Sequence, residues 1–317
     1  MVSKEFKVIY VGISACLLGQ KVRYDGGHKG SDFCQNQLGK HVEYLPLCPE
    51  VGIGMSVPRP TIRLVGDVTQ PRAVVPKTGE DVTQRLADFA DVREQQLAKL
   101  SGYILCAKSP SCGMERVRVY AEDSNMNVKD GTGIFAQRLK EMFPALPMEE
   151  DGRLNDPLLR ENFVLRLYVY FEWQQLPKPI TKHALYQFHA RHKLLLLAHN
   201  QPVYRALGKS LAEQQQIDEE YTTSYIMQLM LGLSAPASRK DHTNVLQHVQ
   251  GYFKQKLDSS ERTELAELIL RYNDGEEPLA APLTLINHYL KRFPDEYLQS
   301  QSYFRPYPDN LRLRYGL

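Results

Sequence analysis

The hydrophobic pattern of the chain changes near residue 150. Before that point, short apolar runs typical of β-strands alternate with loops and helical stretches. The runs are residues 8–13, 42–47, 62–65, 73–75 and 103–107. After it, strand-like alternation ends and the apolar positions carry helical spacing. The pattern predicts an α/β fold class, with an N-terminal parallel-sheet (Rossmann-like) domain and a C-terminal all-helical domain.

Helical spacing also occurs among the strands, at residues 81–100 and 133–143. Gly102 follows the first of these helices and Pro144 ends the second, as expected for helix stops. The helices expected in the second half are residues 157–176, 182–196, 202–208, 219–233, 242–257, 260–273 and 283–293.

The length of 317 residues, at about 150 residues per domain, suggests two domains. Pro157 is suited to the first turn of a helix, and the prolines at 177 and 179 predict a stiff linker. We therefore expect a domain at residues 1–150, a helical connector and linker at 151–179, and a second domain at 180–317.

The net charge of +2 points to neither a nucleic acid nor a membrane as partner. The longest apolar runs, 8–13 and 194–198, are far shorter than the roughly 18 to 20 residues that cross a bilayer. The N-terminus leads into a strand without a signal-peptide cleavage site. We expect a cytoplasmic protein with no membrane partner. Its five cysteines are then reduced and available as ligands or nucleophiles.

Three cysteines, Cys16, Cys48 and Cys112, each follow a predicted strand. The carboxyl ends of parallel strands lie at one edge of a sheet, so these thiols are expected to converge. Cys34, in an expected helix, and Cys106, inside an expected strand, lack this setting and are interpreted as small core residues.

Three converging thiolates suit an iron–sulfur cluster with one iron open to substrate. A structural zinc site would normally have four ligands, often in CxxC pairs, and no such pair occurs. From the residues alone, a metal site and a scatter of buried cysteines both remain open.

Four polar residues near these cysteines are further site candidates. Glu50 and Ser109 could form an acid/base pair beside an open metal position, or could cap neighbouring turns. Arg23 and Asp25, beside the turn at Gly26, could contact a polar ring or phosphate of the substrate, or could serve the turn alone.

Five motifs resemble, in the same order, those of the thiouracil desulfidase family. They are Ser14-Ala15-Cys16-Leu17-Leu18-Gly19, Val22-Arg23-Tyr24-Asp25-Gly26, Pro46-Leu47-Cys48-Pro49-Glu50-Val51, Pro58-Arg59-Pro60 and Lys108-Ser109-Pro110-Ser111-Cys112-Gly113. The resemblance covers roughly residues 5 to 150. Members of that family hold a [4Fe–4S] cluster by three cysteines, and the free iron takes the sulfur of a thiocarbonyl substrate without net redox change.

This resemblance implies a role for each candidate residue of the first half. It makes Cys16, Cys48 and Cys112 the ligands of a [4Fe–4S] cluster with one open iron site. It makes Glu50 the acid/base that activates water, and Ser109 the assisting hydroxyl.

Residues 173–212 contain no Asp or Glu and form a candidate RNA-binding surface. The candidate phosphate contacts are Lys182, Arg191, Lys193, Arg205 and Lys209, with Tyr186, Phe188 and Tyr204 as possible stacking partners. The alternative is a solvated helix face balanced by the acidic stretch 218–220, with the aromatic residues in the core. The four histidines of this segment lack a clean metal-binding pattern, so we expect them to have surface or packing roles.

Residues 180–308 are similar to the YbgA-like domain, through Phe188-His189-Ala190-Arg191-His192-Lys193-Leu194-Leu195 and Phe304-Arg305-Pro306-Tyr307-Pro308. Fusions of that domain to a desulfidase are associated with removing sulfur from 4-thiouridine in transfer RNA. The resemblance therefore implies a non-redox desulfidase that converts 4-thiouridine in tRNA to uridine and releases sulfide. The alternatives are a desulfidase of free thiouracil or thio-nucleosides, and a non-catalytic iron–sulfur or zinc protein that binds RNA or acts as a sensor.

Overall fold

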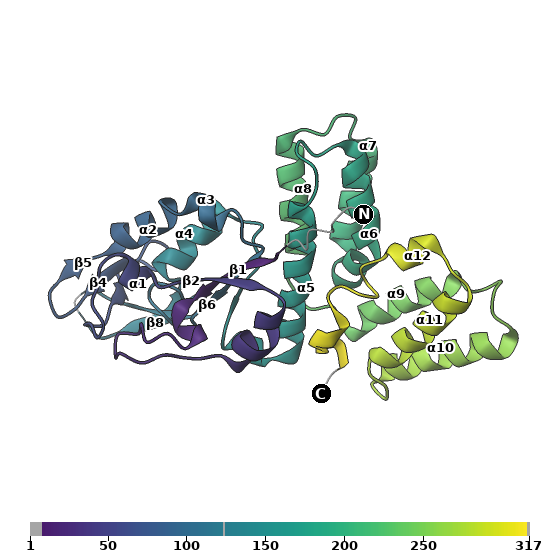
Figure 1. The fold of residues 1–317 in the computed structure, drawn as a ribbon, viewed down its shortest axis with the longest axis horizontal. Helices are drawn as coiled ribbons and strands as arrows, with labels where there is room; N and C mark the ends of the chain where they lie inside the picture. Colours follow the sequence, from purple (N-terminus) through teal and green to yellow (C-terminus); the bar gives the residue numbers. More distant parts are fainter. Residues whose placement is uncertain (1–7, 123, 316–317) are drawn as a thin grey trace, which may run out of the picture. The chain divides into compact units, whose positions relative to one another are not determined.

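The computed structural model describes residues 8–122 and 124–315 (Figure 1). The chain divides into two compact units, Met1–Asp156 and Pro157–Leu317. Helix α5 (Pro157–Gln174) and the proline-containing segment 176–179 belong to the second unit. Most of the segment expected to be a connector is therefore part of the helical unit.

A parallel sheet forms the centre of the first unit. Its strand order is β2 (Glu43–Leu47), β1 (Tyr10–Ser14), β6 (Gly102–Leu105) and β9 (Met148–Glu150). All three pairings are parallel, which confirms the predicted α/β class. Val11 and Ile13 of the central strand β1 are fully buried. Strand β9 was missed because it is three residues long and two of them are glutamates.

The apolar runs at 62–65 and 73–75 were expected in this parallel sheet, and that expectation is wrong. They form β3 (Arg63–Val65) and β4 (Arg72–Val75), which pair antiparallel in a second sheet. The short connection between them cannot hold the dozen or more residues that a parallel crossover needs. The remaining strands of this sheet are β5 (Glu80–Asp81), β7 (Val117–Tyr120) and β8 (Asn127–Gly131), in the order β5-β4-β3-β7-β8.

The helix predicted over 81–100 is broken in two. Helix α2 (Thr83–Asp91) ends before Val92, and α3 (Glu94–Leu97) follows. The Arg93 guanidinium donates to the Phe89 carbonyl, an acceptor that the helix break leaves without a helical partner. The guanidinium also lies 3.7 Å from the centroid of the Phe89 ring. Helix α4 (Ile134–Met142) matches the second predicted helix.

The second unit consists of helices over the residues that the structure describes, as predicted. After α5 they are α6 (Lys182–His199), α7 (Gln201–Glu213), α8 (Glu219–Gly232), α9 (Arg239–Gly251), α10 (Ser259–Asp274), α11 (Ala280–Arg292) and α12 (Glu296–Ser300). Helix α9 departs most from its predicted range of 242–257. It begins at Arg239, because the Ser238 hydroxyl accepts a hydrogen bond from the Asp241 amide and caps the helix, and it ends at Gly251. Trp173 packs on Phe188 and Tyr225 in the core, with ring centroids 5.3 and 5.9 Å away. None of the described helices has the length and apolar character of a membrane span.

Candidate functional site

A cavity of about 880 Å³ opens at the carboxyl ends of the parallel strands. Cys16 lies in the 3-10 turn η1 (Ala15–Leu18) directly after β1, and Cys48 follows β2. Cys112 lies on the loop after β6. All three line this cavity, so the structure brings together the cysteines that were expected to converge.

The three thiols lie in a protected environment. Cys16 and Cys112 are 8% and 4% exposed. Burial, aided by the Glu50 charge, raises the pKa of Cys48 to about 11 and the pKa of Cys112 well above its usual value. Without a bound metal the thiols therefore keep their protons, whereas a coordinated metal would remove them.

Cys106 also lines the cavity, so its interpretation as a core residue is wrong. Strand β6 ends at Leu105, which places Cys106 at the strand end rather than inside the strand. Its amide donates to the Ser14 hydroxyl at 3.0 Å. A hydrogen bond between the two thiols raises the pKa of Cys16 and lowers the pKa of Cys106. Cys34 is fully buried, as expected for a core residue.

Glu50 is the second residue of the short helix α1 (Pro49–Gly52), which begins directly after Cys48. Its Oε1 accepts the Ser111 hydroxyl at 2.8 Å, and its Oε2 accepts the Cys48 thiol at 3.3 Å. The Arg59 guanidinium lies 3.7 Å from Oε2. The carboxylate is thus held at the cavity wall beside one of the candidate ligands.

Ser109 lines the cavity and also caps the turn that carries Cys112. Its Oγ accepts the amides of Ser111 and Cys112 at 3.2 and 3.1 Å. The position of Ser109 therefore fits both interpretations, the assisting hydroxyl of the site and the cap of a turn. Ser111, which is not among the predicted site residues, supplies the hydroxyl that bonds to Glu50. No spacing rule in the sequence distinguishes Ser111 from Ser109.

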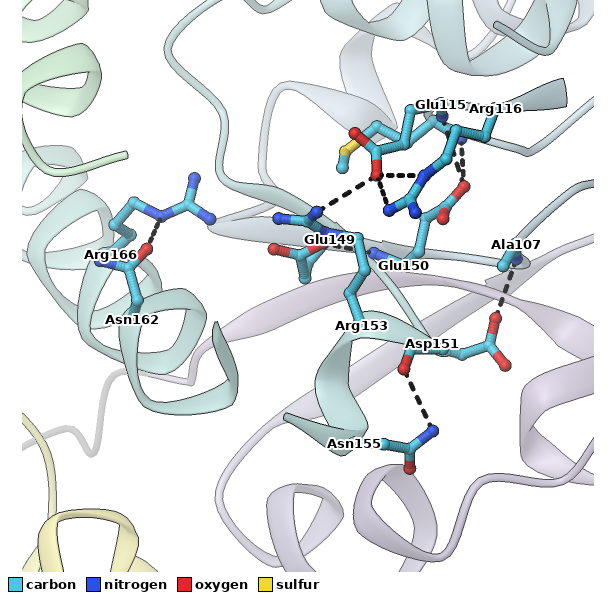
Figure 2. Close-up of polar contacts among 12 residues, drawn as sticks. Ala107, Glu115, Arg116, Glu149, Glu150, Asp151, Arg153, Asn155, Asn162 and Arg166 are labelled. Carbon is cyan, nitrogen blue, oxygen red and sulfur yellow. Dashed lines mark hydrogen bonds and ion pairs between the residues drawn. The ribbon is translucent and has the colours of Figure 1, made fainter. Parts of the chain in front are cut away.

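Glu150 and Asp151, in and directly after β9, bond to the backbone on either side of Ser109 and Cys112, and Figure 2 shows both carboxylates. Glu150 accepts the Met114 amide at 2.8 Å. Asp151, directly after β9, accepts the Ala107 amide at 2.8 Å and lies 2.8 Å from the Lys29 ammonium. The unpredicted strand β9 therefore helps to position the candidate site.

Arg23 and Asp25 occupy different positions. Arg23 lines the cavity. The Asp25 carboxylate accepts the Gly27 amide at 2.9 Å and lies 3.7 Å from the Arg23 guanidinium. Asp25 thus shapes the turn, whereas Arg23 forms part of the cavity wall.

The cysteines that line the cavity are suited to hold a sulfur-containing metal group such as an iron–sulfur cluster. Among residues 8–122 and 124–315, no three His, Cys, Asp or Glu side chains are grouped so as to hold a metal ion. Soft thiols do line one cavity, and the buried Tyr103 hydroxyl has no hydrogen-bond partner among the described residues. Burial raises the pKa of Tyr103, and the cysteines Cys112, Cys48 and Cys16 raise it further, so its hydroxyl lies near the thiol set. A group that accepts a hydrogen bond there would satisfy the hydroxyl.

Tyr103→Phe should stabilise the cluster-free protein by about 1 kcal/mol, because it removes a desolvated hydroxyl that has no partner. Urea unfolding measures the change. Tyr303→Phe is the matched control, since the equally buried Tyr303 hydroxyl bonds to His242 at 2.9 Å. The control should lose about 1 kcal/mol. A similar loss in both variants would show that the Tyr103 hydroxyl has a partner.

The basic segment of the second unit is partly committed to the fold. Arg191 donates to both Glu172 oxygens at 2.6 and 2.9 Å and to the Ser300 carbonyl at 2.7 Å. The segment without acidic residues, 173–212, begins one residue after Glu172, so a charge count over that segment does not include this partner of Arg191. Lys182 donates to the Gln214 carbonyl at 2.8 Å, and Lys209 lies 3.8 Å from Glu213.

The other candidates of this segment differ in exposure. Arg205 is exposed, and the Lys193 ammonium lies 5.9 Å from the Tyr204 ring centroid. The alternative interpretation expected the aromatic residues in the core: Phe188 is buried there, whereas Tyr186 is exposed and Tyr204 is partly buried. The histidines have the expected surface or packing roles: His183 is exposed, His189 bonds to Tyr225, and His192 and His199 are held inside the unit.

Arg191→Ala should destabilise the second unit by roughly 2 to 3 kcal/mol at neutral pH. Burial raises the pKa of Glu172, but hydrogen bonds from Arg191 and His192 outweigh it and bring the pKa to about 2, below the usual 4.5. The resulting stability is present above pH 4.5 and is lost as the pH falls toward about 2. Denaturant unfolding at several pH values checks this. Arg205→Ala is the matched control and should change little; equal effects in both variants would contradict the prediction.

The comparisons with known proteins match the two units separately. The 2-thiouracil desulfurase family matches residues 11–151, and the family DUF1722, a protein family of unknown function, matches residues 193–308. The uncharacterised protein YbgA of Escherichia coli K12 is 43% identical over 159 residues, which are 49% of this chain and 94% of YbgA. The uncharacterised protein YbbK of Bacillus subtilis 168 is 32% identical over 154 residues, 46% of this chain and 98% of YbbK.

One solved structure is similar to part of the chain. The [4Fe-4S]-dependent thiouracil desulfidase TudS is 31% identical, with a TM-score of 0.38, and the match covers 47% of this chain and 94% of TudS. The family assignment rests on the two family matches and on the two curated relatives, whose own lengths this chain covers almost completely. The chain belongs to the 2-thiouracil desulfurase family through its N-terminal unit and carries a C-terminal domain of the DUF1722, YbgA-like family.

Proposed function

We propose that this protein is an iron–sulfur-dependent desulfidase that converts 4-thiouridine in tRNA to uridine and releases sulfide. The observation that carries the proposal is that Cys16, Cys48, Cys112 and Glu50 line the same cavity. Membership of the 2-thiouracil desulfurase family supports the reaction class. The three cysteines are the proposed ligands of a [4Fe–4S] cluster, which when bound would supply a Lewis-acid position for the soft thione sulfur.

The residues around the cavity can activate water. Glu50 is proposed to take a proton from the attacking water, while Ser111 and Arg59 hold its carboxylate in place. The Ser109 oxygen already accepts two amides, so its own proton remains available to donate to the substrate ring. Oxygen from water replaces the thione sulfur, which leaves as sulfide, so no oxidant or reductant is needed.

The substrate proposal rests on both units. A cavity of about 880 Å³ lies at the upper end of the roughly 300 to 1,000 Å³ typical of ligand pockets, which leaves room for more than a free pyrimidine. The helical unit offers Lys193 and Arg205 as proposed phosphate contacts. Lys182 and Lys209 can join them only by adding to or leaving their contacts with Gln214 and Glu213, and Arg191 is occupied by Glu172. Free thiouracil is the second candidate substrate, because the name of the matched family specifies it.

The deciding experiment is reconstitution with iron and sulfide without oxygen, followed by incubation with tRNA that contains 4-thiouridine. We expect the near-ultraviolet thione absorbance to fall and sulfide to appear in equal amount. A parallel reaction with free 2-thiouracil separates the two substrates. Turnover of the free base alone would refute the tRNA proposal, and turnover of neither by cluster-loaded protein would leave the non-catalytic alternative.

A further inference from the structure

Positive side chains dominate the charged lining of the cavity. Among the described residues, Glu50 is the only acidic residue of the lining. The basic residues of the lining are Arg23, Lys29, Arg59, Arg63, Lys108, Arg116, Arg118 and Lys129. A lining with this excess of positive charge favours an anionic ligand.

Some of these cations already have carboxylate partners and some do not. Arg23 pairs with Asp25, Lys29 with Asp151, Arg59 with Glu50 and Arg116 with Glu115. Within the described part of the chain, the cations without an ion pair are Arg63, Lys108, Arg118 and Lys129. Solvent or a ligand must balance their charge.

Arg63, Arg118 and Lys129 come from three neighbouring strands of the second sheet, β3, β7 and β8. Leu64 is aligned with Val119, and both are buried in the core on one face of this sheet. Side chains alternate along a strand, so Arg63 and Arg118 project from the opposite face. Lys129 lines the same cavity from β8. We call these three residues the basic face.

The basic face is wider than one phosphate group. Strands β3 and β8 are separated by two strand spacings, about 10 Å. Three cations spread over that width can each contact a different phosphate of a polynucleotide, whereas a single phosphate would require all three side chains to converge on one point. Tyr120 lies beside these cations on β7, with the Arg63 guanidinium 4.6 Å from its ring centroid. An aromatic ring among cations is typical of surfaces that bind single-stranded nucleic acid.

We propose that the basic face binds successive phosphates of the RNA strand on either side of the thiolated nucleotide, whose base then leaves its stack and enters the cavity. This inference rests on the proposed function and adds an RNA contact within the desulfidase unit itself. It gives that unit a way to hold the strand while the base is extruded, a step that costs a few kcal/mol.

The test measures tRNA binding by the full chain, with its cluster, at several salt concentrations. Arg118→Ala/Lys129→Ala should weaken binding about tenfold and reduce the slope of log K against log salt by about 1.4 to 1.8, the value for two lost phosphate contacts. Arg118→Lys/Lys129→Arg keeps both charges and should stay within about threefold of the native chain. Lys77→Ala/Lys140→Ala removes the same charge from exposed positions of this unit outside the cavity lining and should change the slope little.

Equal binding by the Arg118/Lys129 and Lys77/Lys140 alanine variants would overturn the inference. So would equal weakening for tRNA and for 4-thiouridine monophosphate, since the face would then recognise one phosphate. Iron content and circular dichroism of each variant identify a folding defect. Turnover of thiolated tRNA by the native chain tests the proposed function independently, so a failure of either proposal can be recognised.

Discussion

Cys112→Ala should yield a folded protein that holds less than about a tenth of the native iron and sulfide and has no measurable desulfidase activity. The loss of an outer partner of a metal ligand typically costs about 10- to 100-fold in affinity, so the loss of one of three direct ligands should cost at least about 100-fold. Cys112 is 4% exposed, and its replacement by alanine removes only a small side chain from the cavity wall. Iron and acid-labile sulfide analysis after anaerobic reconstitution measures the effect.

Cys34→Ala is the matched control for this prediction. Cys34 is fully buried in the π-helix Phe33–Gln37 and does not line the cavity. We expect this variant to keep its cluster and its rate. Full cluster content in Cys112→Ala, or an equal loss in Cys34→Ala, would contradict the assignment of Cys112 as a ligand.

Cys106→Ala tests the choice among the four thiols of the cavity. Cys106 is hydrogen-bonded to Cys16 and lies at the end of the same strand that leads to Cys112. With Cys16, Cys48 and Cys112 as ligands, Cys106→Ala should retain most of the iron, whereas Cys16→Ala should lose it. The reverse result would place Cys106, not Cys16, in the ligand set.

The meeting of the three cysteines could be predicted because it depends on a general property of parallel sheets. Each cysteine follows an apolar run, and the carboxyl ends of parallel strands share an edge. The environment of Cys106 could not be predicted in the same way, since a shift of two residues in the strand end moves its side chain from the core to the cavity.

Contacts between distant segments account for the other features that could not be predicted from the sequence. The short runs at 62–65 and 73–75 carry no information on their strand partners, so the second sheet and its basic face were not foreseen. Arg191 pairs with Glu172 across two helices, a contact that a count of charges in a sequence window does not include. The bond from Ser111 to Glu50 likewise joins residues 61 positions apart.

Glu50→Gln should keep the cluster and reduce the turnover number by roughly 100- to 10,000-fold, the usual contribution of a positioned general base. The amide has nearly the same shape and can still accept the Ser111 hydroxyl, which is 2.8 Å from Oε1. It cannot take a proton from water. Single-turnover release of sulfide from thiolated tRNA, measured at equal iron content, separates the chemical step from binding.

Glu43→Gln provides the control for this variant, because it removes the same charge at the exposed beginning of β2, the strand whose other end leads to Cys48 and Glu50. It should turn over at the native rate. A native rate in Glu50→Gln would refute the role of Glu50 as base. Loss of iron in Glu50→Gln would instead show that the carboxylate, which is 3.3 Å from the Cys48 sulfur and 3.7 Å from Arg59, maintains the ligand arrangement. Retained iron with a strongly reduced single-turnover rate is the result expected if Glu50 acts as the base.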